Sequence, residues 1–256
     1  DQIAQGVGGL MWITGLPGQG PVRVGIPVAD LTAGLYAAIG ILTALLQREE
    51  TGEGQHVHTS LLEAQIAMLD FQAARWTIAQ EVPGQAGNNH PTSIPTGVFK
   101  TADGYINIAA SGEQIWQRLC VAIDASDLID DARYKDGPSR LEHRDAVNAA
   151  IETRTVTKSS ADWIDILNQA GVPCGPIYKM DEMWADPQVE HLAMAREVEN
   201  NAIGKHKVVR NAANLSGTPN VPYRGSPERG EHTDEILAEF GFTNEEIEAM
   251  KRNEVV

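Results

Sequence analysis

The longest apolar run of the sequence, Leu31 to Leu46, constrains the fold most strongly. It comprises 16 residues, among them two threonines, two glycines and a tyrosine. A transmembrane helix needs about 20 predominantly apolar residues. The run therefore predicts a helix over about 31–47 that is buried in the core of a globular protein, and no membrane span.

The segments around this run predict a parallel sheet. An apolar strand is expected over Val22–Val28, and a second short strand over Gln55–Thr59, after a glycine-rich turn. Ser60 and Glu63 have the spacing of a capping box, so a helix is expected from there to about residue 80. Alternation of strand and helix is typical of parallel α/β sheets. Residues 1–14 have helical spacing and precede this unit.

The composition changes at residues 81–95, where proline, glycine and asparagine indicate an exposed linker. A second Pro/Gly-rich linker is expected over 211–231. We expect residues 1–80 to form part of a large domain, 96–210 a small α/β domain, and 211–256 a linker with a C-terminal return to the first domain. Linkers this long suit a chain that wraps a partner subunit.

The small domain and the tail are expected to contain further elements. Strands are predicted at 97–101 and 105–109, joined as a hairpin, and at 196–198 and 205–209. Helices are predicted near 111–123, 138–154, 160–170, 180–186, 187–193, 233–240 and 244–252, and a rigid connection at 172–176.

The charge and the cysteine count exclude several classes of function. There are 20 Lys and Arg against 35 Asp and Glu, a net charge of −15. Such a chain lacks the basic field that holds nucleic acid or an anionic membrane. Two cysteines, Cys120 and Cys174, do not make a disulfide framework and suggest reduced thiols in the cytoplasm. His56 and His58 share one side of a predicted strand, but no third ligand is evident, so no metal site is predicted.

Asp30 is the strongest candidate for chemistry. It lies between a predicted strand and a predicted helix, at the carboxyl edge where open α/β sheets bind ligands. Asp is also a favoured helix N-cap, and the spacing alone favours that role. A nucleophile fits as well, because a helix N-terminus keeps a carboxylate ionised and its free N–H groups can bind an oxyanion. The small residues up to Gly34 would let a substrate approach.

Several blocks together resemble the family III CoA-transferases, of the formyl-CoA transferase and carnitine-CoA transferase (CaiB/BaiF) type. The resemblance covers essentially the whole chain, in order, and is greatest to members that use dicarboxylic acyl groups such as succinyl-CoA. The matching blocks are Asp1–Met11, Thr14–Gly15, Gly25–Tyr36, Gly40–Leu46, Thr51–Gln55, Gly87–Pro91 with Pro95, Phe99–Tyr105, Gly171–Pro176, Asp186–Val189, Gly230–Thr233 and Ile236–Leu237.

The resemblance implies a fold and a set of site residues. The fold would be a Rossmann-like large domain with an inserted smaller α/β domain, in an interlocked homodimer, and we expect the N-terminal part of the large domain to lie upstream of this chain. The catalytic aspartate falls on Asp30. Asp1 matches an acidic position that either assists by positioning or is simply a first-turn helix acid. Gly87, Asn89 and His90 match a substrate-binding loop that closes over the intermediate and excludes water.

The implied reaction moves CoA from an acyl-CoA to a carboxylic acid through covalent intermediates on Asp30, with no metal and no tightly bound cofactor. An acyl-CoA racemase of the same superfamily is an alternative, with Asp30 as acid/base and a histidine immediately before the Asp1 position. An inactive fragment that serves as a dimerising scaffold is another. Arg23, Lys100 and Arg210 are candidate partners of the CoA phosphates, although exposed basic residues are usually only solvated.

Overall fold

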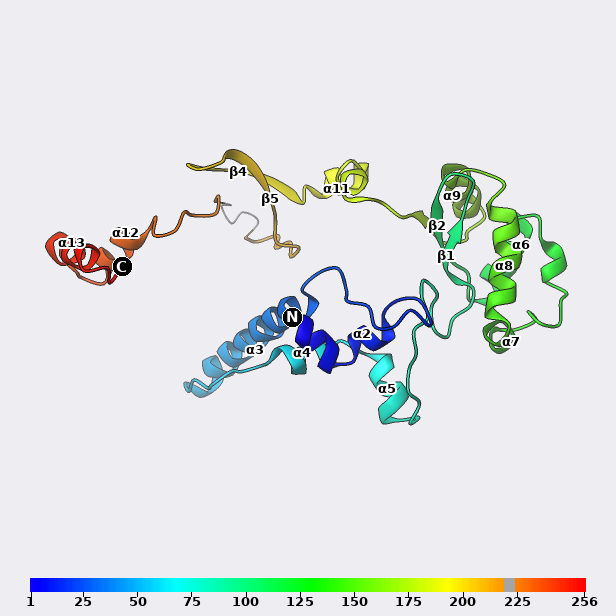
Figure 1. The fold of residues 1–256 in the computed structure, drawn as a ribbon, viewed down its shortest axis with the longest axis horizontal. Coiled ribbons are helices and arrows are strands. Elements are labelled where there is room, and N and C mark those ends of the chain that lie inside the picture. Colours follow the sequence, from blue (N-terminus) through cyan, green and yellow to red (C-terminus); the bar gives the residue numbers. More distant parts are fainter. Residues whose placement is uncertain (219–223) are drawn as a thin grey trace. The chain divides into compact units, whose positions relative to one another are not determined.

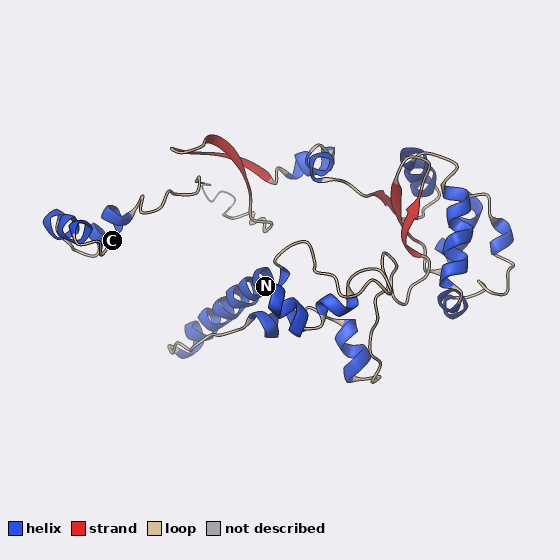
Figure 2. Ribbon diagram, in the orientation of Figure 1, coloured by secondary structure: helices blue, strands red, loops and turns tan. Residues whose placement is uncertain are grey.

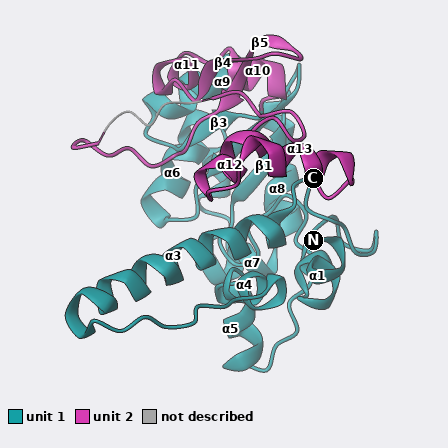
Figure 3. Ribbon diagram, turned by 90° about the vertical axis from the view of Figure 1, so that its left-hand side faces the viewer, with its two compact units in different colours: residues 1–177 teal, residues 178–256 magenta. Residues whose placement is uncertain are grey.

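The computed structural model describes residues 1–218 and 224–256. The chain divides into two compact units, residues 1–177 and 178–256 (Figure 3). This division falls at residue 177, inside the predicted small domain. Each unit is considered by itself below.

The first part of unit 1 is helical (Figure 1). Its elements are α1 (Gln2–Val7), α2 (Leu10–Ile13), α3 (Val28–Thr51), α4 (Leu61–Ala67) and α5 (Phe71–Thr77).

Three of the predicted helices are divided in the structure. The helix predicted near 138–154 is divided at His143 into α7 (Gly137–Glu142) and α8 (Arg144–Thr155). The other two lie in the first part of unit 1. The helix expected over 1–14 is interrupted at Gly9, whose φ of +81° is incompatible with a continuing right-handed helix. The helix expected over 60–80 is interrupted at Asp70, with φ of +50°. Ser60 does cap α4, accepting a hydrogen bond from the Glu63 N–H at 3.1 Å, so the predicted start of this helix is confirmed.

The strands predicted over 22–28 and 55–59 are not formed in the described part of the chain. A strand needs a neighbour to satisfy its backbone groups. Neither segment has one here, and the Val24 N–H is instead bound by the Gln5 side chain at 3.0 Å. The prediction of a parallel sheet from these two segments is therefore wrong for this structure, because periodicity indicates a strand but does not supply its partner.

Helix α3 is not the buried core helix that its apolar sequence predicted. Only Ala29 and Thr32 are buried, and leucines such as Leu35 and Leu46 are 63% and 71% exposed. The reason is that α3 contacts only α1 and α4 extensively, so most of its circumference has no neighbour. By length and composition α3 could also cross a membrane, a test that the core helix of a globular protein passes equally.

The second part of unit 1 is an antiparallel sheet covered by helices (Figure 2). Strands β1 (Thr96–Lys100), β2 (Tyr105–Ala109) and β3 (Cys174–Pro176) lie in the order β1-β2-β3. Phe99 pairs with Ile106, and Ile108 with Cys174. The predicted hairpin is confirmed, whereas the expected rigid connection contributes the third strand.

Helices complete this part of unit 1 around one core. They are α6 (Glu113–Ala122), η1 (Ser126–Leu128), α7 (Gly137–Glu142), α8 (Arg144–Thr155) and α9 (Ser160–Gln169). The strands and helices share one apolar core that includes Phe99, Ile106, Ile108, Trp116, Leu119, Val147, Ile151, Trp163 and Leu167. The N-cap residue of α6 is Gly112, so this helix start has no side-chain cap.

The predicted linker 81–95 is not uniformly exposed. Its Ile94 is 1% exposed and belongs to the core. The buried guanidinium of Arg140 donates to the carbonyls of Ile94 at 3.2 Å and Tyr134 at 2.9 Å. The segment is therefore tied to the sheet and helices that follow it, because its carbonyl groups need partners once they are buried.

Unit 2 contains a hairpin and four helices in its described residues. They are α10 (Met180–Trp184), α11 (Pro187–Leu192), β4 (Ala195–Asn200), β5 (Gly204–Val209), α12 (Thr233–Glu239) and α13 (Asn244–Arg252). Strands β4 and β5 are antiparallel, with Val198 opposite His206. The described part of the predicted linker 211–231 has no helix or strand, and its residues 219–223 lie outside the described residues.

Candidate active site

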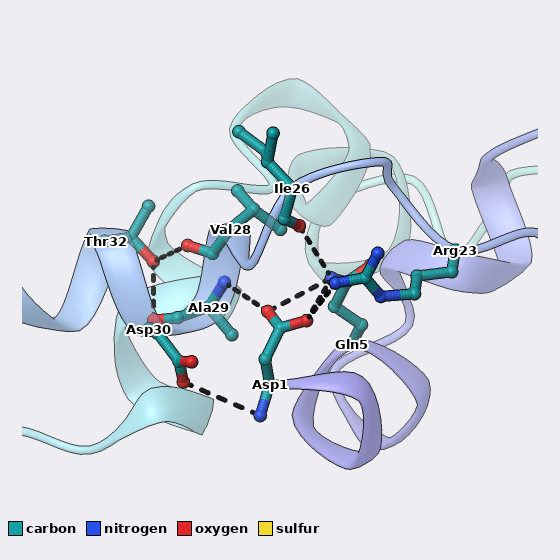
Figure 4. Close-up of polar contacts among 8 residues, drawn as sticks. All are labelled: Asp1, Gln5, Arg23, Ile26, Val28, Ala29, Asp30 and Thr32. Atoms are coloured by element: carbon teal, nitrogen blue, oxygen red, sulfur yellow. Dashed lines mark hydrogen bonds and ion pairs between the residues drawn. The ribbon is translucent and has the colours of Figure 1, made fainter. Parts of the chain in front are cut away.

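Asp30 lies in the first turn of α3 and is not its cap. The helix begins at Val28, so the N-cap position falls on Pro27, and no side chain within the turn caps it. The Asp30 side chain is 52% exposed, and its Oδ1 lies 3.6 Å from the Asp1 backbone nitrogen (Figure 4). The carboxylate is thus carried on the first turn of the helix and remains open to solvent and to a reacting group.

Asp1 supplies the capping interaction instead. Its Oδ1 accepts a hydrogen bond from the Ala29 N–H at 3.1 Å, across 28 residues of chain. Its Oδ2 accepts from Arg23 Nη2, also at 3.1 Å, and its side chain is only 10% exposed. The structure therefore brings Asp1 and Asp30 together, with the carboxylate of Asp1 directed at the backbone that carries Asp30 (Figure 4).

Gln5 completes this cluster and was not singled out from the sequence. It is fully buried, and its Nε2 donates to the Asp1 carboxylate oxygens at 2.9 and 3.1 Å. Nε2 also lies 3.3 Å from the Ile26 carbonyl oxygen, and Oε1 accepts from the Val24 N–H. The four-residue spacing of Asp1 and Gln5 on one helix face was a signal for their contact. No such signal in the sequence indicated the contacts of Gln5 with residues 24–26.

The N–H groups at the start of α3 are partly occupied. Val28 donates to the Ile26 carbonyl at 2.8 Å, and Ala29 donates to Asp1. The expectation of a set of free N–H groups for an oxyanion is therefore wrong at these two positions, because the chain satisfies them itself. One turn further, Gly34 is exposed and has open space where a side chain would be, which leaves this surface accessible.

The loop Gly87–Pro91 lines a separate open groove of about 670 Å³. Its other walls come from β1, β2 and residues 173–175. Asn89 Oδ1 accepts from Asn148 Nδ2 at 2.8 Å, and the Gly87 N–H donates to the Gly15 carbonyl at 3.0 Å. Among the described residues, no hydrogen bond or ion pair joins this loop to Asp1 or Asp30, so the structure does not bring the two predicted groups into direct contact.

The His90 side chain stabilises the turn that follows it. Its Nδ1 accepts hydrogen bonds from the backbone N–H groups of Thr92 at 3.2 Å and Ser93 at 2.9 Å. In the neutral ring the proton therefore sits on Nε2. The ring stacks on Phe71 with centroids 5.8 Å apart. His90 can offer a ligand one N–H donor, while its second nitrogen serves the loop.

Neither cysteine competes with Asp30 as a nucleophile. Burial raises the pKa of the Cys120 thiol to about 12 and that of the Cys174 thiol to about 11. Both are protonated at neutral pH, and the thiol is a much weaker nucleophile than the thiolate. His56 and His58 have ring centroids 5.5 Å apart, and residues 1–218 and 224–256 contain no group of three acidic, histidine or cysteine side chains placed to hold a metal.

The three candidate phosphate partners have different environments. Arg23 is engaged by Asp1, and Lys100 is exposed at the end of β1. Arg210 donates to the carbonyls of Leu192 and Asn211 in unit 2. No hydrogen bond of the described residues links the three into one site.

Comparison with known proteins identifies relatives over almost the whole chain. Residues 1–233 match the model of CoA-transferase family III. Succinyl-CoA:glutarate CoA-transferase of Homo sapiens is 35% identical over 239 residues, which are 93% of this chain and 55% of that protein. Succinate--glutarate CoA-transferase of Agrobacterium fabrum is 36% identical over 94% of this chain and 60% of its own length.

A solved structure has a fold similar to that of this chain. A CAIB/BAIF family protein from Brucella suis matches with a TM-score of 0.79 and 31% identity, over 93% of this chain and 62% of that chain. This chain thus spans 55–60% of the length of the two curated relatives.

Proposed function

Because this chain belongs to CoA-transferase family III, we propose that it moves CoA from an acyl-CoA donor to a carboxylic acid acceptor, with Asp30 as the nucleophile. The observation that supports the proposal is that two neighbouring acids, Asp1 and Asp30, have different roles. Asp1 caps α3 through Ala29, and this leaves the half-exposed carboxylate of Asp30 free to react.

The chemistry balances with the groups of the chain and its two substrates. An Asp30 carboxylate oxygen attacks the thioester carbonyl, the C–S bond breaks, CoA leaves as a thiolate, and an aspartyl–acyl anhydride remains. The thiolate attacks the aspartyl carbon, which releases the donor's acid and leaves an aspartyl–CoA thioester. The acceptor carboxylate then repeats these steps in reverse. Splitting one transfer into such covalent steps is nucleophilic catalysis.

The position of Asp30 in a first helical turn supports this role. Helix α3 places this acid in its first turn, where the partial positive charge of the helix N-terminus lies. The two cysteines are held as thiols, so they offer no competing nucleophile. Exposure of Gly34, one turn away, leaves room for the substrate to reach the helix surface.

The substrate class follows from the relatives. Two of them are named for succinate or succinyl-CoA and for glutarate, both dicarboxylic. We propose a dicarboxylic acyl-CoA donor and a small carboxylic acid acceptor, with the loop of Gly87, Asn89 and His90 on the substrate side. Their amide and imidazole donors suit a carboxylate, and the groove that they line is open.

The assembly is also a proposal. Residues 1–80 and the tail 211–256 would belong to a Rossmann-like large domain and residues 96–210 to the small one, in an interlocked cytoplasmic homodimer. The apolar face of α3 supports this, because an exposed surface of this kind usually marks an interface. The exposed segment 211–218 is consistent with a tether.

The test is Asp30→Asn in the full-length protein that contains this chain. Asn preserves the size of the side chain and makes no change to the cap that Asp1 provides, but it removes the nucleophile. We expect transfer from succinyl-CoA to glutarate to be lost, while sedimentation equilibrium still shows a dimer. Near-normal transfer by Asp30→Asn would contradict the assignment, and a wild-type monomer at micromolar concentration would contradict the dimer.

A further inference from the structure

We propose that Gln5 is a positioning residue that fixes the backbone of Asp30 during catalysis. This inference rests on the proposed function. Gln5 does not contact Asp30 itself. It acts through Asp1 and through the segment that leads into α3.

The contacts of Gln5 hold that segment at three points. Its Oε1 binds the Val24 N–H at 3.0 Å, and its Nε2 lies 3.3 Å from the Ile26 carbonyl oxygen. Through Nε2 it also holds the Asp1 carboxylate, which binds the Ala29 N–H. Residues 24, 26 and 29 lie within the six positions before Asp30, so the contacts fix the path of the chain up to the nucleophile (Figure 4).

The amide of glutamine meets a requirement that few side chains can meet. The site needs an acceptor for Val24, and donors for the Asp1 carboxylate and the Ile26 carbonyl, from one fully buried side chain. An amide carries one acceptor oxygen and two donor hydrogens. Methionine has a similar length but removes the acceptor of the Val24 N–H and the amide donors to Asp1 and Ile26. A glutamate can reproduce the donor only when it is protonated.

Because a glutamate at position 5 can donate a hydrogen bond only when it is protonated, Gln5→Glu provides a pH-dependent test. The charged groups around position 5 are Asp1 and Arg23, with Asp30 behind Asp1, while α4 contributes the neutral Gln65 beside Gly8. In Gln5→Glu, the acid form donates its O–H to Asp1 and accepts from Val24. Its ionised form repels the Asp1 carboxylate, so the new proton is retained to a higher pH than on an isolated glutamate.

The experiment measures kcat and KM for CoA transfer from succinyl-CoA to glutarate between about pH 5.5 and pH 8.5, a range that spans ionisation of a raised glutamate. Gln5→Glu should approach wild-type kcat at the acid end. At the alkaline end its kcat should fall roughly tenfold to a hundredfold, the scale of a nucleophile displaced by about 1 Å. KM should change little. Gln5→Met should show the low kcat at every pH.

Gln2→Glu is the matched control, because Gln2 is exposed in the same helix and the change in charge is identical. It should follow wild type at every pH, and melting curves show that each variant is folded. Equal kcat profiles for folded Gln5→Glu and Gln2→Glu, or wild-type kcat in Gln5→Met, would overturn the positioning role. Absence of CoA transfer by the wild-type protein would instead overturn the proposed function, and with it this role.

Discussion

Asp1 and Asp30 are neighbouring acids with opposite environments. The Asp1 carboxylate is nearly buried and accepts from Gln5, Arg23 and the Ala29 backbone. Hydrogen bonds to a charged group contribute about 1.5–3 kcal/mol each, so this carboxylate is fixed in place. Asp30 is half exposed, and the described part of the chain offers its carboxylate no such set of donors. One acid can therefore organise the helix start while the other remains available for reaction.

Asp103 gives a prediction about acid stability. Its carboxylate accepts from the Ser160 N–H at 2.8 Å and the Ser160 hydroxyl at 2.9 Å, and these bonds lower the pKa of Asp103. A lowered folded-state pKa gives stability that is complete above the ordinary value of about 3.9 and is lost as pH falls through the lower value. We expect the melting temperature of wild type to fall more steeply than that of Asp103→Asn as pH drops below about 4.

The measurement is a series of melting curves for both proteins at decreasing pH. Other carboxylates with lowered pKa values, such as Asp136 and Asp186, contribute the same acid response to both. The difference between the two curves therefore isolates Asp103. Parallel curves would show that its bonds to Ser160 do not stabilise the fold.

The sequence singled out Asp30 as a candidate, but it did not show how the start of its helix is held. Asp30 was identified from its place before an apolar helix, which is local information. The cap came from Asp1, 28 residues away. Gln5 has ordinary helical spacing, and nothing in the sequence shows that its amide binds residues 24 and 26. Interactions between distant segments depend on packing, which periodicity does not encode.

At the scale of elements, the segments whose structure is decided locally were predicted well. The hairpin β1–β2 needs only its own alternation and turn, and it forms. Helices such as α9, with Ser159 capping the Asp162 N–H, also follow local rules. The strands expected over 22–28 and 55–59 need partners from elsewhere, and residues 1–218 and 224–256 supply none. The apolar sequence of α3 gave its helical state but not its burial.

The junction between α1 and α2 provides a prediction with a matched control. A side chain at Gly8 would overlap the buried Gln65 amide and come within 2.9 Å of the Ala4 carbonyl oxygen. We expect Gly8→Ala to reduce the free energy of unfolding by about 1–3 kcal/mol, the usual range for overpacking. Gly6→Ala, two residues earlier, meets only the Met11 sulfur at 3.8 Å. It should stabilise the helix by about 0.5–1 kcal/mol.

Urea unfolding of both variants measures these changes. The two substitutions add the same methyl group within one short stretch of chain, so they differ mainly in what that group meets. Equal free energies of unfolding for Gly8→Ala and Gly6→Ala would contradict the close packing of Gln65 on Gly8.

At the scale of the whole molecule, the described residues form one shared core, in the second part of unit 1, and the long apolar helix α3 lies largely outside it. The resemblance of many ordered blocks indicated the family, and the family model matches residues 1–233. The Rossmann-like arrangement and the dimer stay predictions. Both would require α3 and its neighbouring segments to pack against further protein, and in the described residues α3 packs extensively only against α1 and α4.

The central claim is that Asp30 becomes covalently acylated, and trapping that intermediate tests it most directly. The full-length protein would be incubated with succinyl-CoA and then with hydroxylamine, which converts an activated aspartyl carbonyl into a hydroxamate. Mass spectrometry of the peptides should show one hydroxamate, at Asp30, that depends on succinyl-CoA and is absent from Asp30→Asn. Transfer without any adduct, an adduct at another residue, or rapid exchange of the α-proton with solvent in the absence of an adduct would contradict the account, and the last result would identify a racemase.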